Sequence, residues 1–276
     1  MKLTFRIEYR TAWGESIGVM LQGQENSPIM LGTSDGIVWE GSEEMTDAPA
    51  GVPLTYRYGV FLDGQCSRRE SGTMAHIFCP SKKQKSHYIL NDTWKDLPMA
   101  SHLYSAAFSG NYSLENAPKD QCTGQGDIVF RALCPCLHHR KQILGICGRE
   151  EQLGYWNPDR AICMEEIQAN EWVATLPIKD LKFPLEFKFV AINASTGKVE
   201  EWEMGNNRHL HINDLRKGEI FFTNEMEVQF GSMSRKVAGT AIPVFSLRSE
   251  GSFGVGDFGD LKKLIDWAEQ THQQAV

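Results

Sequence analysis

The chain has 276 residues and a formal net charge of −7, because 35 Asp and Glu residues outnumber 28 Lys and Arg residues. This acidic balance disfavours nucleic acid and anionic membrane surfaces as partners, since their phosphates attract basic proteins. With 41% hydrophobic residues the chain can bury a core and is not expected to be disordered. Neutral ligands, sugars above all, remain compatible with this composition.

The N-terminus does not have the pattern of a leader. Lys2, Arg6 and Glu8 interrupt its apolar residues, so no signal-peptide apolar region is present. No segment reaches the roughly 18 consecutive apolar residues of a membrane span. Seven cysteines, an odd number, indicate reduced thiols rather than a disulfide framework. Together these features predict a cytoplasmic protein.

An internal repeat organises most of the chain. Residues 3–7 (LTFRI) match residues 128–132 (IVFRA), and residues 54–58 (LTYRY) match residues 185–189 (LEFKF). Two further pairs stand in the same order, namely Gly23 with Gly148 and Trp39 with Trp172. Matching anchors in one order predict two copies of a single unit, with small insertions in loops.

Each copy consists of short alternating runs separated by turn signals. The clearest run places Leu185, Phe187 and Phe189 on one face and Glu186 and Lys188 on the other, as in a half-buried strand. This pattern predicts a mainly β fold with two immunoglobulin-like β-sandwiches of about seven strands each.

The expected organisation has five parts. They are a first copy (1–95), a polar linker (96–125), a second copy (126–215), a connector (216–239) and a C-terminal piece (240–276). The connector contains an Ile-Phe-Phe run at residues 220–222 that fits a strand. In the C-terminal piece we expect a strand over 241–246 and then a helix, which together would begin an α/β domain. The apolar face of this helix is formed by Leu261, Leu264, Ile265 and Ala268.

Three pieces of the second copy carry groups that suit a sugar. They are residues 153–158 (LGYWNP), 186–189 (EFKF) and 201–208 (EWEMGNNR). A pyranose has an apolar C–H face that an aromatic ring can cover, and a rim of hydroxyls that Lys, Asn and Glu can bind. The second copy is therefore the candidate carbohydrate-binding part of the chain.

At these residues the chain resembles family 20 carbohydrate-binding modules, the starch-binding domains of amylolytic enzymes. The family pattern of Leu-Gly-x-Trp, a strand-initial Trp, an aromatic-Lys-aromatic triplet and Trp-Glu-x-x-x-Asn-Arg is met at residues 153–156, 172, 187–189 and 202–208. The resemblance implies α-1,4-glucans as ligands: starch, glycogen and malto-oligosaccharides.

The same resemblance implies which residues bind. Trp156 and Trp202 match the rings that stack on adjacent glucoses, and Lys188 and Asn207 match their hydrogen-bonding partners; we group Glu203 with this site. Although a tryptophan in a sandwich is usually core, the four-part match favours ligand contact. Trp39, Trp172 and Arg208 are interpreted as structural residues.

The first copy is a degenerate version of this module. Arg57 stands where the module has its Lys, and residues 27–31 and 67–72 stand where the two tryptophan pieces belong. Residues 11–16 resemble the loop of a second glucan site, which leaves Trp13 open between ligand contact and packing. The corresponding loop of the second copy has the sequence His-His-Arg at 138–140, so no second site is expected there.

Residues 242–268 resemble the start of the family 77 glycoside hydrolase barrel of the amylomaltases. Tandem starch-binding modules ahead of this barrel resemble the disproportionating enzyme 2 type of 4-alpha-glucanotransferase, which moves glucosyl units from maltose or short glucans to glycogen-like acceptors. Retaining transfer needs two carboxylates about 5 Å apart, on a barrel of roughly 250 residues. The matching catalytic positions lie beyond Val276, so the chain is expected to be a truncated, inactive transferase that binds glucan, with no cofactor or metal.

Other interpretations stay open. Two immunoglobulin-like modules could bind protein or mediate dimerisation instead, and a homodimer is one such assembly. The modules could also belong to another catalytic domain, such as an amylase or a phosphoglucan phosphatase. Residues 254–259 satisfy Gly-x-Gly-x-x-Gly, a weak dinucleotide signal when it stands alone. Cys134, Cys136 and His138 would share one strand face and suggest zinc, but no clear second ligand pair follows.

Overall fold

The computed structural model describes residues 1–45, 52–71, 75–80, 87–96, 127–135, 137, 141–168, 170–179, 181–212, 215–216, 218–233, 238–273 and 276. Residues 97–125 of the expected linker lie outside these ranges, as do residues 138–140, where no second glucan site was expected. The chain forms two compact units, Met1–Phe230 and Gly231–Val276, which are described separately below.

The larger unit is built from strands, which confirms the mainly β fold. We call its two copies the first module (β1–β8) and the second module (β9–β17). The first module contains β1 (Lys2–Glu8), β2 (Glu15–Leu21), β3 (Ile29–Met30), β4 (Val38–Glu44), β5 (Leu54–Leu62), β6 (Gln65–Arg69), β7 (His76–Phe78) and β8 (His87–Asp92). The second contains β9 (Asp127–Leu133), β10 (Gln142–Gly148), β11 (Ile162–Cys163), β12 (Glu165–Gln168), β13 (Glu171–Pro177), β14 (Leu185–Asn193), β15 (Val199–Trp202), β16 (Arg208–Leu210) and β17 (Glu219–Glu227).

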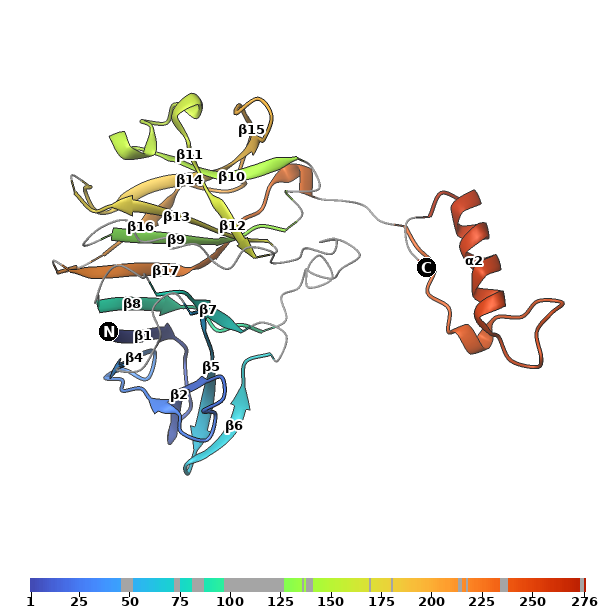
Figure 1. Cartoon of the computed structure of the whole chain (residues 1–276), viewed down its shortest axis with the longest axis horizontal. Coiled ribbons are helices and arrows are strands. Elements are labelled where there is room, and N and C mark those ends of the chain that lie inside the picture. Colours follow the sequence, from blue (N-terminus) through green and yellow to red (C-terminus); the bar gives the residue numbers. More distant parts are fainter. Residues whose placement is uncertain are drawn as a thin grey trace. The chain divides into compact units, whose positions relative to one another are not determined.

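The two modules share one seven-stranded sheet, of order β12-β13-β9-β17-β8-β1-β4. Strand β17 joins them, because it pairs in parallel with β8 on one side and with β9 on the other. It contains residues 220–222 and lies in the middle of the unit (Figure 1). The last strand of the second module is therefore the strand that joins the two modules.

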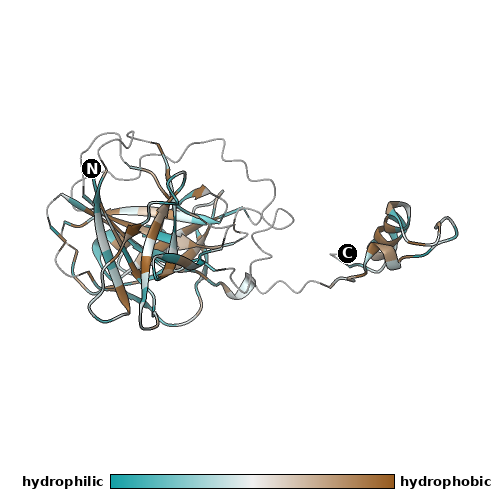
Figure 2. Ribbon diagram, turned by 90° about the horizontal axis from the view of Figure 1, so that it is seen from below, coloured by the Kyte–Doolittle hydropathy of each residue, from teal (hydrophilic) through white to brown (hydrophobic). Residues whose placement is uncertain are grey.

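Each module adds a smaller five-stranded sheet of its own. The first module has β3-β2-β5-β6 with β7 beside β5, and the second has β11-β10-β14-β15 with β16 beside β14. In Figure 1 the smaller sheet of the second module (β10, β14, β15) lies at one end of the larger unit, and that of the first module (β2, β5, β6) lies at the other. In β8 and in the first part of β14 buried residues alternate with half-buried ones, as in a strand with one face toward a core. Figure 2 shows hydrophobic and hydrophilic stretches along the strands.

The register of the shared sheet shows how each face is filled. Phe222 packs into the core of the first module together with Val129 and Val173 of the second. On the opposite face, the ring centroid of Phe130 lies 5.3 Å from that of Phe187 in the smaller sheet of the second module. Neighbouring residues of β9 thus face the cores of different modules, as strand alternation requires.

The internal repeat is confirmed by the strand pairing. Trp39 stands opposite Ile7 in the first module, and Trp172 stands opposite Ala132 in the second. Both tryptophans are buried, as predicted.

One anchor of the predicted repeat is wrong. In the first module Leu21 pairs with Tyr56, and in the second Gly148 pairs with Phe187. Since Tyr56 and Phe187 are equivalent, the counterpart of Gly148 is Leu21, two residues before Gly23. A Cβ on Gly148 would lie 2.5 Å from the Glu186 carbonyl oxygen, which explains why this strand position is a glycine only in the second module.

The smaller unit contains α2 (Phe258–Gln270), as predicted, but the strand expected over 241–246 is wrong. Val244–Ser246 form a short 3₁₀ helix instead. A barrel strand is hydrogen-bonded to strands on both sides, and the described part of this unit has no strand to pair with it. The expected first βα unit is therefore represented by its helix alone. No helix among the described residues is long and apolar enough to cross a membrane.

Candidate glucan-binding site

Trp156 and Trp202 meet at the surface of the second module. Their ring centroids lie 6.3 Å apart and the ring planes are inclined by 42°. Both side chains are half-buried. Trp202 ends β15 and packs partly against the small cluster of Cys147, Val190 and Ile192. The sheet thus supports one ring of the pair from below.

Trp156 is held by an unusual loop between β10 and β11. Gly154, Tyr155 and Trp156 all have positive φ angles, of 83°, 52° and 59°. The Trp156 backbone N–H donates to the Gly148 carbonyl oxygen over 2.7 Å, which fixes the loop to the end of β10. Left-handed conformations at two successive non-glycine residues store backbone strain of a kind that gathers at functional sites.

Lys188 lies beneath the loop that follows Trp202. Its Nζ atom donates to the carbonyl oxygens of Glu203, at 3.1 Å, and Gly205, at 2.8 Å. An ammonium group has three donors, so two of them hold this loop and one can serve a ligand.

Asn207 is exposed and is oriented by a carboxylate of β14. Its Nδ2 atom donates to Glu186 Oε1 over 2.7 Å, and Glu186 is in turn ion-paired with Arg149. This bond fixes the orientation of the amide, whose side-chain oxygen can accept a hydrogen bond from a hydroxyl.

Glu203, which the sequence grouped with the sugar-binding residues, has a different environment. Its side chain is only 2% exposed. Glu203 Oε1 accepts from the Phe189 backbone N–H over 2.8 Å, and Arg208 Nε donates to both carboxylate oxygens, at 3.1 and 2.9 Å. A carboxylate bound in this way supports the strand and does not point into solvent, and Arg208 has the structural position expected for it.

Trp13 lies in the loop between β1 and β2 of the first module, and its side chain is fully exposed. It borders a hollow of about 710 Å³, which Thr33, Asp35 and Trp39 also line. Asp35 Oδ1 accepts from the backbone N–H groups of Ile37 and Val38, which fixes the Asp35 carboxylate against this part of the wall.

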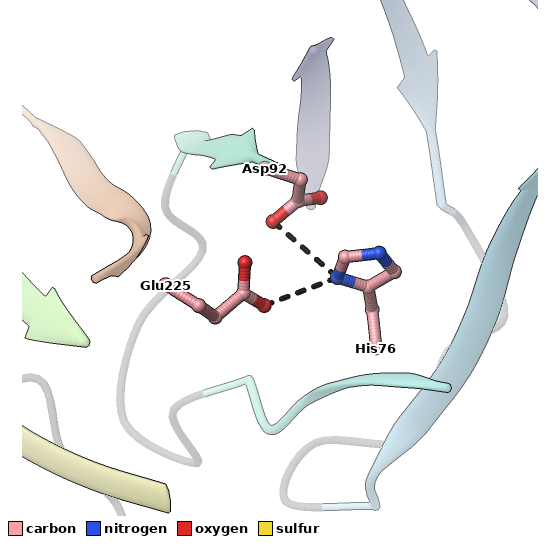
Figure 3. A group of neighbouring side chains, drawn as sticks. All are labelled: His76, Asp92 and Glu225. Atoms are coloured by element: carbon pink, nitrogen blue, oxygen red, sulfur yellow. Dashed lines mark hydrogen bonds and ion pairs between the residues drawn. The ribbon is translucent and has the colours of Figure 1, made fainter. Parts of the chain in front are cut away.

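A buried charged cluster was not predicted from the sequence. It contains His76, Asp92 and Glu225, the one group among the described residues whose atoms lie close enough together to hold a metal ion (Figure 3). His76 Nδ1 lies 3.1 Å from Glu225 Oε1 and 3.8 Å from Asp92 Oδ1. Burial lowers the pKa of His76, but the Asp92 and Glu225 carboxylates outweigh it and raise that pKa to about 9.

Two further cations occupy this cluster. Arg131 Nη2 lies 2.7 Å from Asp92 Oδ1, and Arg131 Nη1 lies 3.2 Å from Glu225 Oε1. Lys95 Nζ lies 3.3 Å from Glu225 Oε1. The carboxylates are therefore already paired, and the cluster is suited to joining the modules rather than to binding a metal. No motif marked these residues, because they come from distant parts of the chain.

Two protein families match parts of the chain. The starch binding domain family matches residues 127–221, and the 4-alpha-glucanotransferase family of glycoside hydrolases, family 77, matches residues 242–276. A curated relative, 4-alpha-glucanotransferase DPE2 of Oryza sativa subsp. japonica, is 27% identical over 289 residues. That match covers 96% of this chain and 30% of the relative.

Two solved structures are similar to part of the chain. A glycoside hydrolase family 15 glucoamylase from Hypocrea jecorina matches at 17% identity and a TM-score of 0.31, over 40% of this chain and 18% of the other. The family 20 module of a maltotetraose-forming amylase from Pseudomonas saccharophila STB07 matches at 19% identity and a TM-score of 0.26, over 35% of this chain and 99% of the other. Residues 127–221 of the chain are thus similar to starch binding domains, and residues 242–276 are similar to 4-alpha-glucanotransferases.

Proposed function

We propose that this chain is the glucan-binding region of a 4-alpha-glucanotransferase. The observation that carries the proposal is the inclined pair of Trp156 and Trp202 on a starch-binding domain. In an α-1,4-glucan the chain curls, so the faces of successive glucoses are inclined to one another. Two rings at 42° suit two such faces better than coplanar rings would.

Polar groups beside the rings support the same site. The third donor of Lys188 and the amide oxygen of Asn207 bind hydroxyls at the rim of the sugars. Glu203 acts by holding Arg208 and strand β14 in place. Two stacked glucoses with two or three hydrogen bonds favour weak, reversible binding to a polymer that offers many equivalent positions.

The activity of the whole enzyme would be the transfer of α-1,4-glucosyl units from maltose or short glucans to glycogen-like acceptors. In this scheme the second module holds the polymer while a barrel domain beyond residue 276 performs the chemistry. We place the protein in the cytoplasm, with α-glucans as its partners. Dimerisation through the modules is the second candidate role, and only the missing stacking rings of the first module favour it.

Calorimetric titration with maltoheptaose tests the site. We expect saturable binding by the wild-type chain and a loss of about tenfold or more in Trp202→Ala, because a buried aromatic contact of this kind contributes about 1.4 kcal/mol or more. Trp172→Phe is a matched control, since it alters a buried core tryptophan outside the site. Absence of heat for the wild type, or equal affinities for wild type and Trp202→Ala, would refute the proposal.

Trp13 is proposed as a further contact with glucan, in the hollow of the first module. Its full exposure means that Trp13→Ala should leave the unfolding temperature unchanged. Sedimentation with insoluble starch granules should nevertheless retain less of this variant than of the wild type. Equal retention of the two proteins would assign Trp13 no role in binding.

A further inference from the structure

The strand register shows what the first module has where the second module has its tryptophan pair. Gly59 pairs with Arg69 in the first module, and Val190 pairs with Trp202 in the second. Gly59 follows the LTYRY run and Val190 follows the LEFKF run, so the two are equivalent. Arg69 therefore occupies the position of Trp202.

The next residue confirms this alignment independently. Glu70 Oε2 accepts from the Tyr58 backbone N–H over 2.7 Å, just as Glu203 Oε1 accepts from the Phe189 backbone N–H over 2.8 Å. His76 Nε2 lies 2.9 Å from Glu70 Oε1. In the first module His76 is therefore the partner of the buried glutamate, as Arg208 is in the second. The buried framework of the site is thus retained in the first module while its surface residues have changed.

The changed residues line a pocket of about 170 Å³. Arg57, at the position of Lys188, and Arg69 supply two guanidinium groups to it. Gln22 and Glu25 come from the loop after β2, the counterpart of the loop that carries Trp156. Arg69 is exposed and Arg57 is half-buried, so both can meet a ligand from solvent.

The chemistry of this pocket differs from that of a neutral glucan site. Neither stacking ring is present, so the apolar face of a pyranose finds no flat surface of comparable area. Two arginines against one glutamate leave a net positive pocket on a chain whose net charge is −7. Guanidinium groups bind phosphate oxygens through paired, charge-assisted hydrogen bonds.

We propose that the pocket formed by Arg57 and Arg69 in the first module binds the phosphate group of a phosphorylated sugar. The phosphate lies between the two guanidinium groups, and the Gln22 amide binds a hydroxyl of the sugar that carries it. The first module would then recognise phosphorylated glucose units, and the second would recognise neutral ones. This inference concerns the first module alone and does not depend on glucan binding by Trp156 and Trp202.

An NMR titration of the full chain tests the proposal. We expect glucose 6-phosphate to shift the side-chain Nε–H signals of Arg57 and Arg69, and glucose at the same concentration to leave them in place. Inorganic phosphate should shift the same signals but bind more weakly, because it lacks the sugar hydroxyls. Raising the salt concentration should weaken both phosphate ligands, since exposed charges are screened.

The adjacent arginines of β6 provide a matched pair of variants. Arg69→Gln should weaken glucose 6-phosphate binding about tenfold or more, the usual loss for one charge-assisted hydrogen bond. Arg68→Gln makes the same change of charge on the opposite strand face, where Arg68 Nη2 pairs with Glu15 at 3.2 Å, and it should not affect binding. Arg69 is exposed, so its replacement leaves the fold intact.

Three results would overturn the inference. They are unshifted Arg57 and Arg69 signals with glucose 6-phosphate, equal weakening by Arg68→Gln and Arg69→Gln, and equal affinity for inorganic phosphate and glucose 6-phosphate. Titration of the same sample with maltoheptaose measures glucan binding by the second module separately. Failure of either site is therefore distinguishable from failure of the other.

Discussion

Arg131, on β9 of the second module, donates through Nη2 to the Asp92 carboxylate, on β8 of the first module, over 2.7 Å. The same guanidinium donates through Nε to the Thr223 carbonyl oxygen of β17 over 2.6 Å. One side chain therefore connects β8 of the first module with β9 and β17 of the second. Because Arg131 is 8% exposed, this connection is made away from solvent.

Removing this cation should destabilise the whole unit. We expect Arg131→Met to lower the free energy of unfolding by about 3–5 kcal/mol, because Asp92 and Glu225 are left buried without it. Chemical denaturation followed by tryptophan fluorescence measures the change. Arg68→Gln, which breaks an ion pair whose arginine side chain is 48% exposed, should cost less than about 1 kcal/mol. Similar losses for the two variants would contradict the role given to Arg131.

The cluster also predicts how stability depends on pH. The pKa of His76 is raised from its ordinary value of 6.5 to about 9 in the folded protein, so folding favours the protonated imidazole. Its contribution is complete below pH 6.5 and is lost as the pH rises through about 9. The difference corresponds to about 3 kcal/mol. The groups that face His76 are Glu70, Asp92, Glu225, Tyr56 and Tyr58.

Unfolding temperatures measured from pH 6 to pH 9.5 test this dependence. The wild type should lose stability between pH 6.5 and about 9. His76→Asn should be less stable than the wild type at pH 6, and its stability should depend little on pH between 6.5 and 9. Burial and Asp92 raise the pKa values of Tyr56 and Tyr58, so these two hydroxyls do not titrate between pH 6.5 and 9. Parallel pH profiles for wild type and His76→Asn would disprove the assignment.

The strained loop between β10 and β11 predicts that the affinity for glucan can be lowered without removing an aromatic ring. A Cβ on Gly154 would lie 2.7 Å from the Arg160 carbonyl oxygen, so Gly154→Ala must displace the loop that holds Trp156. We expect maltoheptaose binding to weaken about tenfold, since misplacing one stacked ring removes about 1.4 kcal/mol. Gly197→Ala is the control, because its φ is also positive but no atom lies within 4 Å of the added Cβ. Equal affinities for the two variants would show that the loop geometry is unimportant.

The role of Glu203 can be separated from that of the surface residues. If it supports the strand, Glu203→Ala should lower the free energy of unfolding by about 2–4 kcal/mol, because Arg208 and the Phe189 N–H lose their acceptor. Glu203→Gln keeps an oxygen near the Phe189 N–H, so it should lower the free energy of unfolding by a smaller amount. Thermal unfolding and titration with maltoheptaose should be measured on the same samples. Unchanged stability with lost binding would instead make Glu203 a direct contact of the sugar.

The sequence was sufficient where a feature depends on neighbouring residues. Alternation along residues 185–189 predicted strand β14 and its buried face, and the spacing of apolar residues after 258 predicted α2. The pieces around Trp156 and Trp202 identified the candidate site, since both rings lie in short motifs with a recognisable order. The buried positions of Trp39 and Trp172 also followed from the repeat.

Features that depend on partners from elsewhere could not be predicted in the same way. The strand expected over 241–246 is not formed, because a strand needs hydrogen bonds from other strands. The burial of Glu203 was not predictable either, because the sequence gives residue type and spacing but not exposure. The equivalence of Arg69 with Trp202 became visible only through strand register.

Two arginines of the repeat show the boundary between what sequence and tertiary structure decide. Arg6 and Arg131 occupy the same position in the two copies, so local sequence predicts the same strand and the same face for both. Arg6 is exposed, whereas Arg131 is buried beside Asp92 of the first module and Glu225 of β17. The sequence by itself determined two β modules and a glucan motif, because alternation and turns are local. Only the tertiary structure decided that the modules share one sheet, because the pairing of β17 with β8 joins residues more than a hundred positions apart. Burial in that sheet replaces the water around Arg131 and its carboxylate partners with specific ion pairs.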